Sequence, residues 1–129
     1  MKKDTLPTNA ELEILILLWE NGSSTVRQIH DQILKNKNTG YTSTLKIMQN
    51  MHDKNMISRR LKEQAHIYYP LLKREQIQKQ MLGGFVNKLF KGSSKELILS
   101  ALGNQETTSG DIAEIREMLN KLEEKRDIL

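Results

Sequence analysis

The sequence predicts a mainly α-helical fold, a winged helix-turn-helix of three helices and a β-hairpin wing, followed by a C-terminal helical region. Three segments with helical apolar spacing come first, and two short β-like runs joined by a polar tip follow them. The rest of the 129-residue chain returns to helical spacing. Three helices and then a hairpin is the order of a winged helix. We therefore divide the chain into a winged-helix domain, residues 1–72, and a helical domain, residues 73–129.

The first helix is predicted to begin at Thr8. Residues 8–11 form a capping-box pattern, in which the side chains of Thr8 and Glu11 each accept a hydrogen bond from the other residue's backbone N–H. Apolar residues then follow at helical spacing until Gly22 ends the helix: Leu12, Leu15, Ile16 and Trp19. A second helix is capped by one of Ser23, Ser24 and Thr25, and its apolar face is made of Val26, Ile29 and Ile33.

The third helix, residues 42–54, is the most informative segment. At about 100° per residue, its apolar and polar side chains separate onto two faces. The apolar face comprises Thr44, Leu45, Ile47, Met48 and Met51. The opposite side, here called the polar face, lies within an arc of about 120° and comprises Thr42, Ser43, Lys46, Gln49, Asn50 and Asp53. Asn55 is expected to end the helix in the left-handed conformation.

Two β-like runs, residues 56–61 and 66–69, are separated by the polar residues 62–65 and predict a hairpin. Its strand-forming segments carry two aromatic residues in succession, Tyr68 and Tyr69. Alternation along a strand predicts that one of them packs on the core, in preference to stacking on a nucleic-acid base. Pro70 is expected to end the second strand.

The tail is predicted to be helical and to hold two chains together. Its first helix has an apolar residue at every fourth position and contains Gly83 and Gly84, which suit either close approach of a partner helix or a hinge. Ser93 or Ser94 caps a short helix that Gly103 closes, and a last helix starts near Ser109. Apolar residues of that helix alternate steps of three and four, as in a seam packed on another helix. The predicted dimerisation residues are Phe85, Leu89, Ile112, Ile115, Leu119 and Leu122.

Charge and side-chain chemistry point to a polyanionic partner. The formal net charge is +4, and residues 35–62 contain seven Lys or Arg against a single acid, Asp53. Hydroxyls, amides and a lysine on one rigid helix suit the donors and acceptors of base edges in a major groove. The predicted contacts to double-stranded DNA are Thr42, Ser43, Lys46, Gln49 and Asn50, with Arg59 and Arg60 of the hairpin on the backbone. The alternatives are the ordinary polar face of a surface helix and an edge strand guarded by charge.

Several function classes find no support in the sequence. The chain has no cysteine, and its histidines, His30, His52 and His66, lack metal-ligand spacing. There is no Gly-rich phosphate loop, activated-serine motif or recognisable acid pair, so we expect neither an enzyme nor a cofactor or metal. No apolar run approaches the ~20 residues of a membrane helix, which predicts no membrane insertion and a cytoplasmic location. The main rival to a DNA-binding protein is a winged-helix module that binds another protein and never DNA.

Short pieces of the chain, in this order, match the pattern of a known family. They are Thr8-Asn9-Ala10-Glu11, Leu15, Leu18-Trp19, Thr25-Val26, Ile29, Gly40-Tyr41-Thr42-Ser43-Thr44-Leu45-Lys46, Asp53-Lys54-Asn55-Met56-Ile57 and His66-Ile67-Tyr68-Tyr69-Pro70. Together they resemble the penicillinase-repressor (BlaI/MecI/CopY) family of winged-helix transcriptional regulators. The resemblance covers nearly the whole chain, including the tail.

The resemblance implies a homodimer whose winged helices bind a palindromic, inverted-repeat operator and block transcription. Members commonly have arginine at the position of Asn50 and glycine at that of Asn55, which bears on base preference. The copper-sensing branch uses a cysteine-rich C-terminal segment, which this chain lacks. The β-lactam branch is relieved by proteolysis at an Asn-Phe bond in the tail, where this chain has Ser100 and Ala101. The resemblance therefore implies a regulatory protease as a partner only if a bond near Ser100 and Ala101 replaces the Asn-Phe bond.

Overall fold

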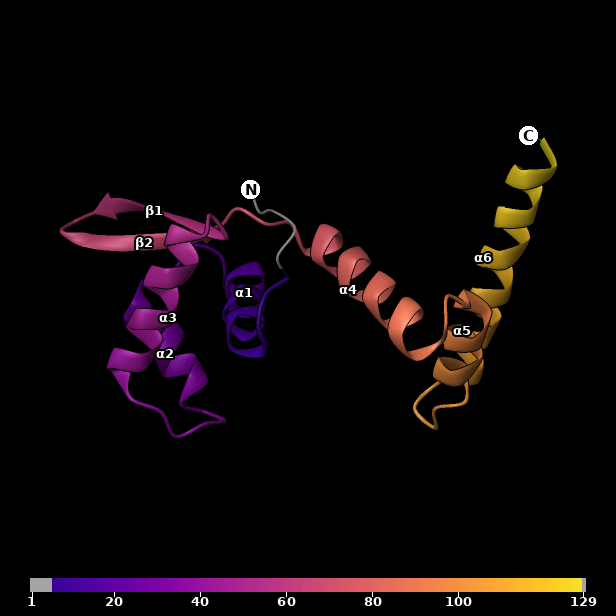
Figure 1. The fold of residues 1–129 in the computed structure, drawn as a ribbon, viewed down its shortest axis with the longest axis horizontal. Helices are drawn as coiled ribbons and strands as arrows, with labels where there is room; N and C mark the ends of the chain where they lie inside the picture. The colour runs from indigo at the N-terminus through magenta and orange to yellow at the C-terminus, as the bar shows by residue number, and fades with distance from the viewer. Residues whose placement is uncertain (1–5, 129) are drawn as a thin grey trace. The chain divides into compact units, whose positions relative to one another are not determined.

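The computed structural model describes residues 6–128, and the chain forms two compact units (Figure 1). The first extends to Leu82 and the second starts at Gly83. This division reflects packing within one chain and lies inside the helix α4, Arg74–Leu89. The predicted division at residues 72 and 73 concerns binding and dimerisation and stays a prediction.

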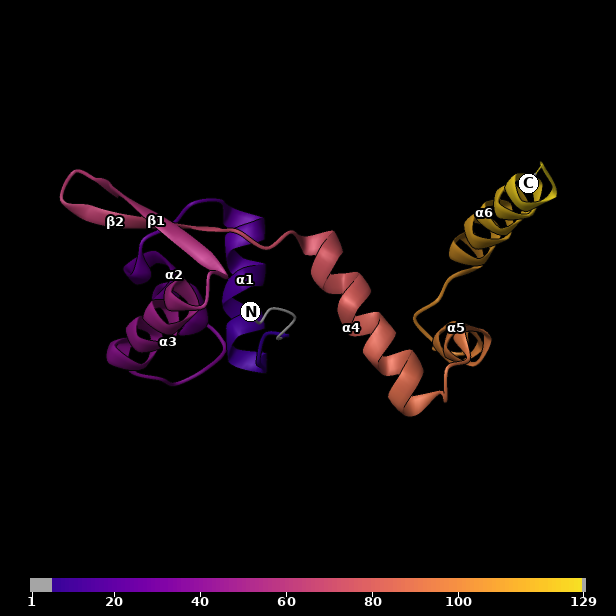
Figure 2. The ribbon, with the colours of Figure 1, turned by 45° about the horizontal axis from the view of Figure 1, so that its top comes forward.

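The first unit contains three helices and a two-stranded antiparallel sheet, in the predicted order. Its helices are α1 (Asn9–Asn21), α2 (Val26–Ile33) and α3 (Tyr41–Asp53). The strands β1 (Ile57–Lys62) and β2 (Ala65–Pro70) form the hairpin, here called the wing, which projects beside α3 in Figures 1 and 2. The expected winged-helix architecture is confirmed.

Local signals placed the helix ends well. The Glu11 N–H donates to Thr8 Oγ1 at 3.2 Å and the Thr8 N–H donates to Glu11 Oε1 at 3.0 Å, so the first capping box is confirmed. Of the three candidate caps of α2, Thr25 is the one used, in a second box with Gln28. Asn55 has φ = +65°, the left-handed conformation expected after α3.

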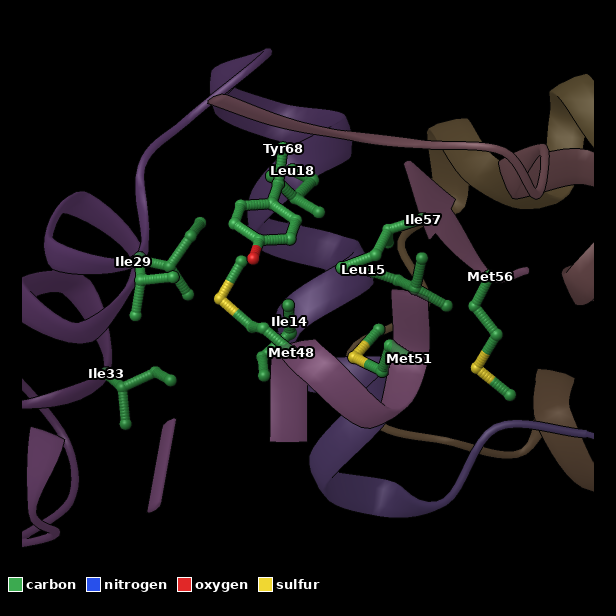
Figure 3. Packing of buried hydrophobic residues seen from close by; sticks show 11 residues of the cluster. Ile14, Leu15, Leu18, Ile29, Ile33, Met48, Met51, Met56, Ile57 and Tyr68 are labelled. Atoms are coloured by element: carbon green, nitrogen blue, oxygen red, sulfur yellow. The ribbon is translucent and has the colours of Figure 1, made fainter. Parts of the chain in front are cut away.

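A single core joins the helices to the wing (Figure 3). The ring of Tyr68 lies over it, which confirms that this tyrosine packs inward. In α1 the buried face is Glu11, Ile14, Leu15 and Leu18, whereas Ile16 is exposed. The expectation that Ile16 shares the inner face is wrong, because α1 is apolar nearly all round and spacing alone does not select one side.

The wing is longer and its turn tighter than the sequence suggested. Strand pairing runs from Ile57 opposite Pro70 to Lys62 opposite Ala65, so only Glu63 and Gln64 form the turn. Both have positive φ, +50° and +69°, as a two-residue turn that matches the strand twist requires. At its base, β2 is tied to the segment before α2, because the Ser24 and Tyr68 backbones exchange hydrogen bonds of 2.9 and 2.8 Å.

The second unit contains the end of α4, α5 (Ser94–Leu102) and α6 (Ser109–Ile128). Ser93 caps α5 by accepting from the Glu96 N–H at 3.2 Å, and Thr108 and Asp111 exchange 3.0 Å hydrogen bonds at the start of α6. The helix α4 is continuous through Gly83 and Gly84. Beyond the chain neighbours and the backbone of α4 itself, a Cβ at either position would meet nothing within 4 Å among residues 6–128, so no contact in that part of the chain requires glycine there.

Candidate nucleic-acid interface

The two faces of α3 separate as its sequence predicts. Thr44 is 2% exposed and Met48 and Met51 are fully buried against α1, α2 and the wing. The five predicted DNA-binding residues of this helix are all exposed: Thr42, Ser43, Lys46, Gln49 and Asn50. A side of the helix that carries donors, acceptors and one cation is thus open to a ligand, while the other side anchors the helix in the core.

Buried polar contacts hold α3 against α2. The ring of His30, 4% exposed, lies with its Nδ1 2.9 Å from Thr44 Oγ1. The same ring meets the ring of Tyr41 edge-on, with centroids 5.5 Å apart. A buried hydrogen bond has directional requirements that apolar packing lacks, so this pair helps to set the angle between the two helices.

The far end of α3 is tied to α1 through an ion pair. Lys54 Nζ lies 2.6 Å from Glu11 Oε2, and the Glu11 side chain is 7% exposed. Burial by itself would raise the pKa of Glu11, but hydrogen bonds from Lys54 and the Thr8 N–H, with the Lys54 charge, outweigh it. The pKa of Glu11 is therefore lowered from its ordinary value, and the carboxylate stays ionised at neutral pH.

The two predicted arginines of the wing lie in different surroundings. Arg59, half-buried, donates to Tyr68 Oη at 3.2 Å and stands opposite that tyrosine in the strand register. Arg60 is exposed, with its guanidinium carbon 5.7 Å from the centroid of the Tyr69 ring. Successive residues of a strand point to opposite faces, so these two cannot contact the same group.

A groove separates α3 from the wing, and it collects residues of both. Its volume is about 590 Å³, and it is here called the α3–wing groove. Gln49 and Arg59, two predicted DNA contacts, line it together with residues from the start of α2. Arg60 and the remaining predicted residues of α3 are not among its lining residues. The predicted contacts thus divide between an exposed helix face and the groove beside it.

Sequence reasoning missed two residues of this groove, Arg27 and Tyr41. The guanidinium carbon of Arg27 lies 4.2 Å from the centroid of the Tyr41 ring, a cation–π contact between α2 and α3. A lone arginine in a short helix carries no periodic signal. The one available clue was that α2 has no acidic residue in its first turn to pair with it.

The predicted dimerisation residues form no interior within this chain. Their exposed fractions run from 39% to 68%, except for Ile115, which is half-buried: Phe85, Leu89, Ile112, Leu119 and Leu122. Apolar side chains at regular helical spacing with so much exposed surface are typical of contact faces. Their assignment to a dimer stays a prediction.

Residues 6–128 contain neither a metal-binding cluster nor a membrane-spanning helix. No group of three or more His, Asp or Glu in that part of the chain is placed to hold a metal ion. No helix there combines the length and apolar character needed to cross a bilayer.

Comparison with known proteins agrees with this geometry. Residues 7–121 match the model of the penicillinase repressor family. A penicillinase repressor of Staphylococcus aureus is 27% identical over 116 residues, which cover 90% of this chain and 92% of that protein. The methicillin resistance regulatory protein MecI of Staphylococcus aureus (strain N315) is 24% identical over 114 residues, 88% of this chain and 93% of that protein.

A solved structure shares the fold. The structure of a MarR family protein from Bacillus stearothermophilus superimposes with a TM-score of 0.55 and 17% identity, and the match covers 96% of this chain and 78% of that chain. Identity at this level supports the architecture alone. The family model and the shared fold confirm the resemblance that the sequence indicated.

Proposed function

Since the chain belongs to the penicillinase repressor family, we propose that this transcriptional repressor binds an inverted-repeat DNA operator as a homodimer, through α3 and the wing. It is a regulator and not an enzyme, as its relatives are repressors. Family membership supports the role of repressor, and the contact residues and the requirement for two chains are our proposal.

The observation that carries the proposal is the exposed polar face of α3. An α-helix fits the major groove of B-DNA, where each base pair presents its own pattern of donors and acceptors. Gln49 and Asn50 offer amides that can bond adenine in a bidentate manner, and Lys46 can bond guanine or a phosphate. Because the apolar side of the same helix is locked in the core, these side chains are presented on a rigid support.

The tail supplies the second half of the proposal. An isolated winged helix contacts few base pairs, whereas two joined copies gain from effective concentration. The exposed apolar residues of α4 and α6 are suited to pack on a second copy. Two α3 helices about 34 Å apart would then match half-sites one turn of DNA apart.

Relief of repression is proposed to follow from cleavage within residues 97–102. Ser100 and Ala101 occupy the bond position that the family resemblance suggests, and both are exposed near the end of α5. A cut there would separate α6 from the rest of the chain and remove its contribution to the dimer. Mass spectrometry of the protein from induced cells would show a fragment ending in this segment, and an intact chain would contradict the proposal.

The decisive experiment measures duplex binding as a function of salt. The operator is first selected from genomic fragments with the purified protein, and affinity is then measured for it and for random DNA. Binding that weakens steeply with salt supports the repressor, since phosphate contacts release counterions. Absent or salt-insensitive binding would favour the rival, a module that uses α3 against another protein.

Single substitutions then test the assigned residues. Lys46→Ala should weaken operator binding, while Lys125→Ala removes the same charge from α6 and should leave it unchanged. Gln49→Ala or Asn50→Ala should relax the preference at one base pair by about 1–3 kcal/mol. Equal losses on operator and random DNA would make these two residues backbone contacts instead of base contacts.

A further inference from the structure

The α3–wing groove is lined by two arginines, Arg27 and Arg59, and by the imidazole of His66. No Asp or Glu is among its lining residues. The first turn of α3 also carries no acidic residue. A concave surface lined by one sign of charge concentrates the field and favours an anionic ligand.

The position of the groove beside α3 indicates that its anionic ligand is a backbone phosphate of DNA. Tyr41, Leu45 and Gln49 line the groove, and they follow one another every four residues along one stripe of the helix. Gln49 already belongs to the polar face, so Tyr41 and Leu45 are the part of the stripe that borders that face. A helix with its side chains is about 10–12 Å wide and the major groove is about 12 Å wide. When the polar face points at the bases, the bordering stripe therefore faces the sugar–phosphate wall.

We propose that the α3–wing groove receives a phosphate of the operator backbone, with Arg27 as its ligand and Tyr41 as the residue that positions Arg27. This inference rests on the proposed DNA-binding function and adds a contact from α2 that neither the polar face nor the wing includes. The planar guanidinium presents a fixed fork of donors that matches phosphate geometry.

Tyr41 limits the freedom of the Arg27 side chain. The guanidinium stacks on its ring at 4.2 Å, and the ring is itself held edge-on by the buried His30. Less side-chain entropy is then lost when the phosphate binds. Arg59, which also lines the groove, donates one of its five N–H groups to Tyr68 Oη, and this contact limits the freedom of its side chain.

The test compares the salt dependence of three variants of the full chain. Arg27→Gln should reduce the slope of log K against log[salt] by about 0.9 per half-site, the contribution of one phosphate. Arg27→Lys keeps the charge and should keep the slope. Arg126→Gln makes the same change in the last turn of α6 and should have no effect. An unchanged slope for Arg27→Gln would overturn the assignment.

A contact to a backbone phosphate should contribute equally to binding of any DNA sequence. Arg27→Gln should weaken binding to operator and to random DNA by the same factor, on the order of tenfold per half-site at 0.1 M salt. A larger loss on the operator would make Arg27 a base contact. If the unmodified chain lacks salt-dependent duplex binding, the proposed function itself fails. If the unmodified chain binds but Arg27→Gln leaves the slope unchanged, only the Arg27 assignment fails.

The positioning role of Tyr41 has its own readout. Tyr41→Leu should lower affinity with the slope retained, because the charges remain, and Tyr41→Phe should restore affinity, because the ring remains. Equal losses in both variants would exclude stacking as the positioning contact. Inorganic phosphate alone should shift the NMR signals of Tyr41 without reaching saturation, because it lacks the other contacts of the duplex. A shift that saturates with phosphate alone would assign the groove to a small anion instead of DNA.

Discussion

The two units of the chain differ in what lies inside them. In the first unit, side chains from three helices and the wing form one buried cluster that includes Leu15, Met48 and Tyr68. In the second, no residue from 83 to 127 is buried, although the unit contains large apolar side chains such as Leu99 and Leu119. The first unit therefore contains a core of its own, whereas the second leaves its large apolar side chains exposed, as in a contact face.

Local signals in the second unit are nevertheless as clear as in the first. Ser93 caps α5, and Thr108 and Asp111 cap α6, so each helix has a defined start. Caps contribute about 1 kcal/mol each, whereas most helical stability in proteins comes from packing of an apolar face. Caps therefore define where the helices of the second unit begin, and the proposed second copy would supply the packing that stabilises them.

The largest expected effect comes from the seam of α6. Leu119→Asp places a charge where the proposed dimer buries an apolar side chain, and it should yield monomers in sedimentation. Loss of bivalency should lower operator affinity by about 10²–10⁴-fold. Asn120→Asp adds the same charge beside the seam and should leave the dimer intact. If Leu119→Asp stays dimeric, the interface moves to the apolar residues of α4, Phe85 and Leu89.

A core substitution should destabilise the first unit without affecting the dimer contacts proposed for the second. Leu15 is fully buried, and Leu15→Ala should lower the free energy of unfolding of the first unit by about 2–5 kcal/mol. Leu122→Ala removes the same atoms from an exposed site and should leave that unfolding free energy unchanged. Denaturant unfolding of both variants, followed by the fluorescence of Trp19, tests the difference. Equal destabilisation would mean that the two units fold as one.

The sequence predicted those features that residues close together in the chain determine. Thr8 and Glu11 predicted a capping box, Asn55 predicted a left-handed helix end, and the polar face of α3 follows from a period of 3.6 residues. These features depend on residues within a few positions of one another. The order of helices and strands followed from the same local patterns.

The features that the sequence did not predict depend on contacts between residues far apart in the chain or on the packed core. The stacking of Arg27 on Tyr41 exists because α2 and α3 cross at one angle, which no spacing along the chain encodes. The tight turn at Glu63 and Gln64 was missed because neither residue is the Asn or Gly that favours positive φ. The buried side of α1 was also ambiguous, since only the packed core decides it.

A smaller effect is expected from the ion pair that joins α1 to α3. The pKa of Glu11 is lowered on folding, so its ionised form contributes stability that is present above pH 4.5 and lost as pH falls through the folded pKa. Glu11→Gln should cost about 1–3 kcal/mol at pH 7, and its difference from the unmodified chain should shrink below pH 4.5. A difference independent of pH would contradict this account. Glu13→Gln, at the more exposed pair with Lys37, is the matched control and should change little.

The smallest effect concerns the turn of the wing, and it tests whether the two units are energetically independent. Glu63 and Gln64 both occupy the left-handed region, which is unfavourable for residues with a side chain other than Asn or Asp. The double substitution Glu63→Asn and Gln64→Gly should therefore stabilise the first unit by about 1 kcal/mol. Alanine at both positions removes the same side chains, keeps the unfavourable φ and should give no gain. Because the turn belongs to the first unit alone, its thermal midpoint should rise by about 4–8 °C while the dimer dissociation constant stays the same. A change in that constant would show that the wing and the tail are coupled.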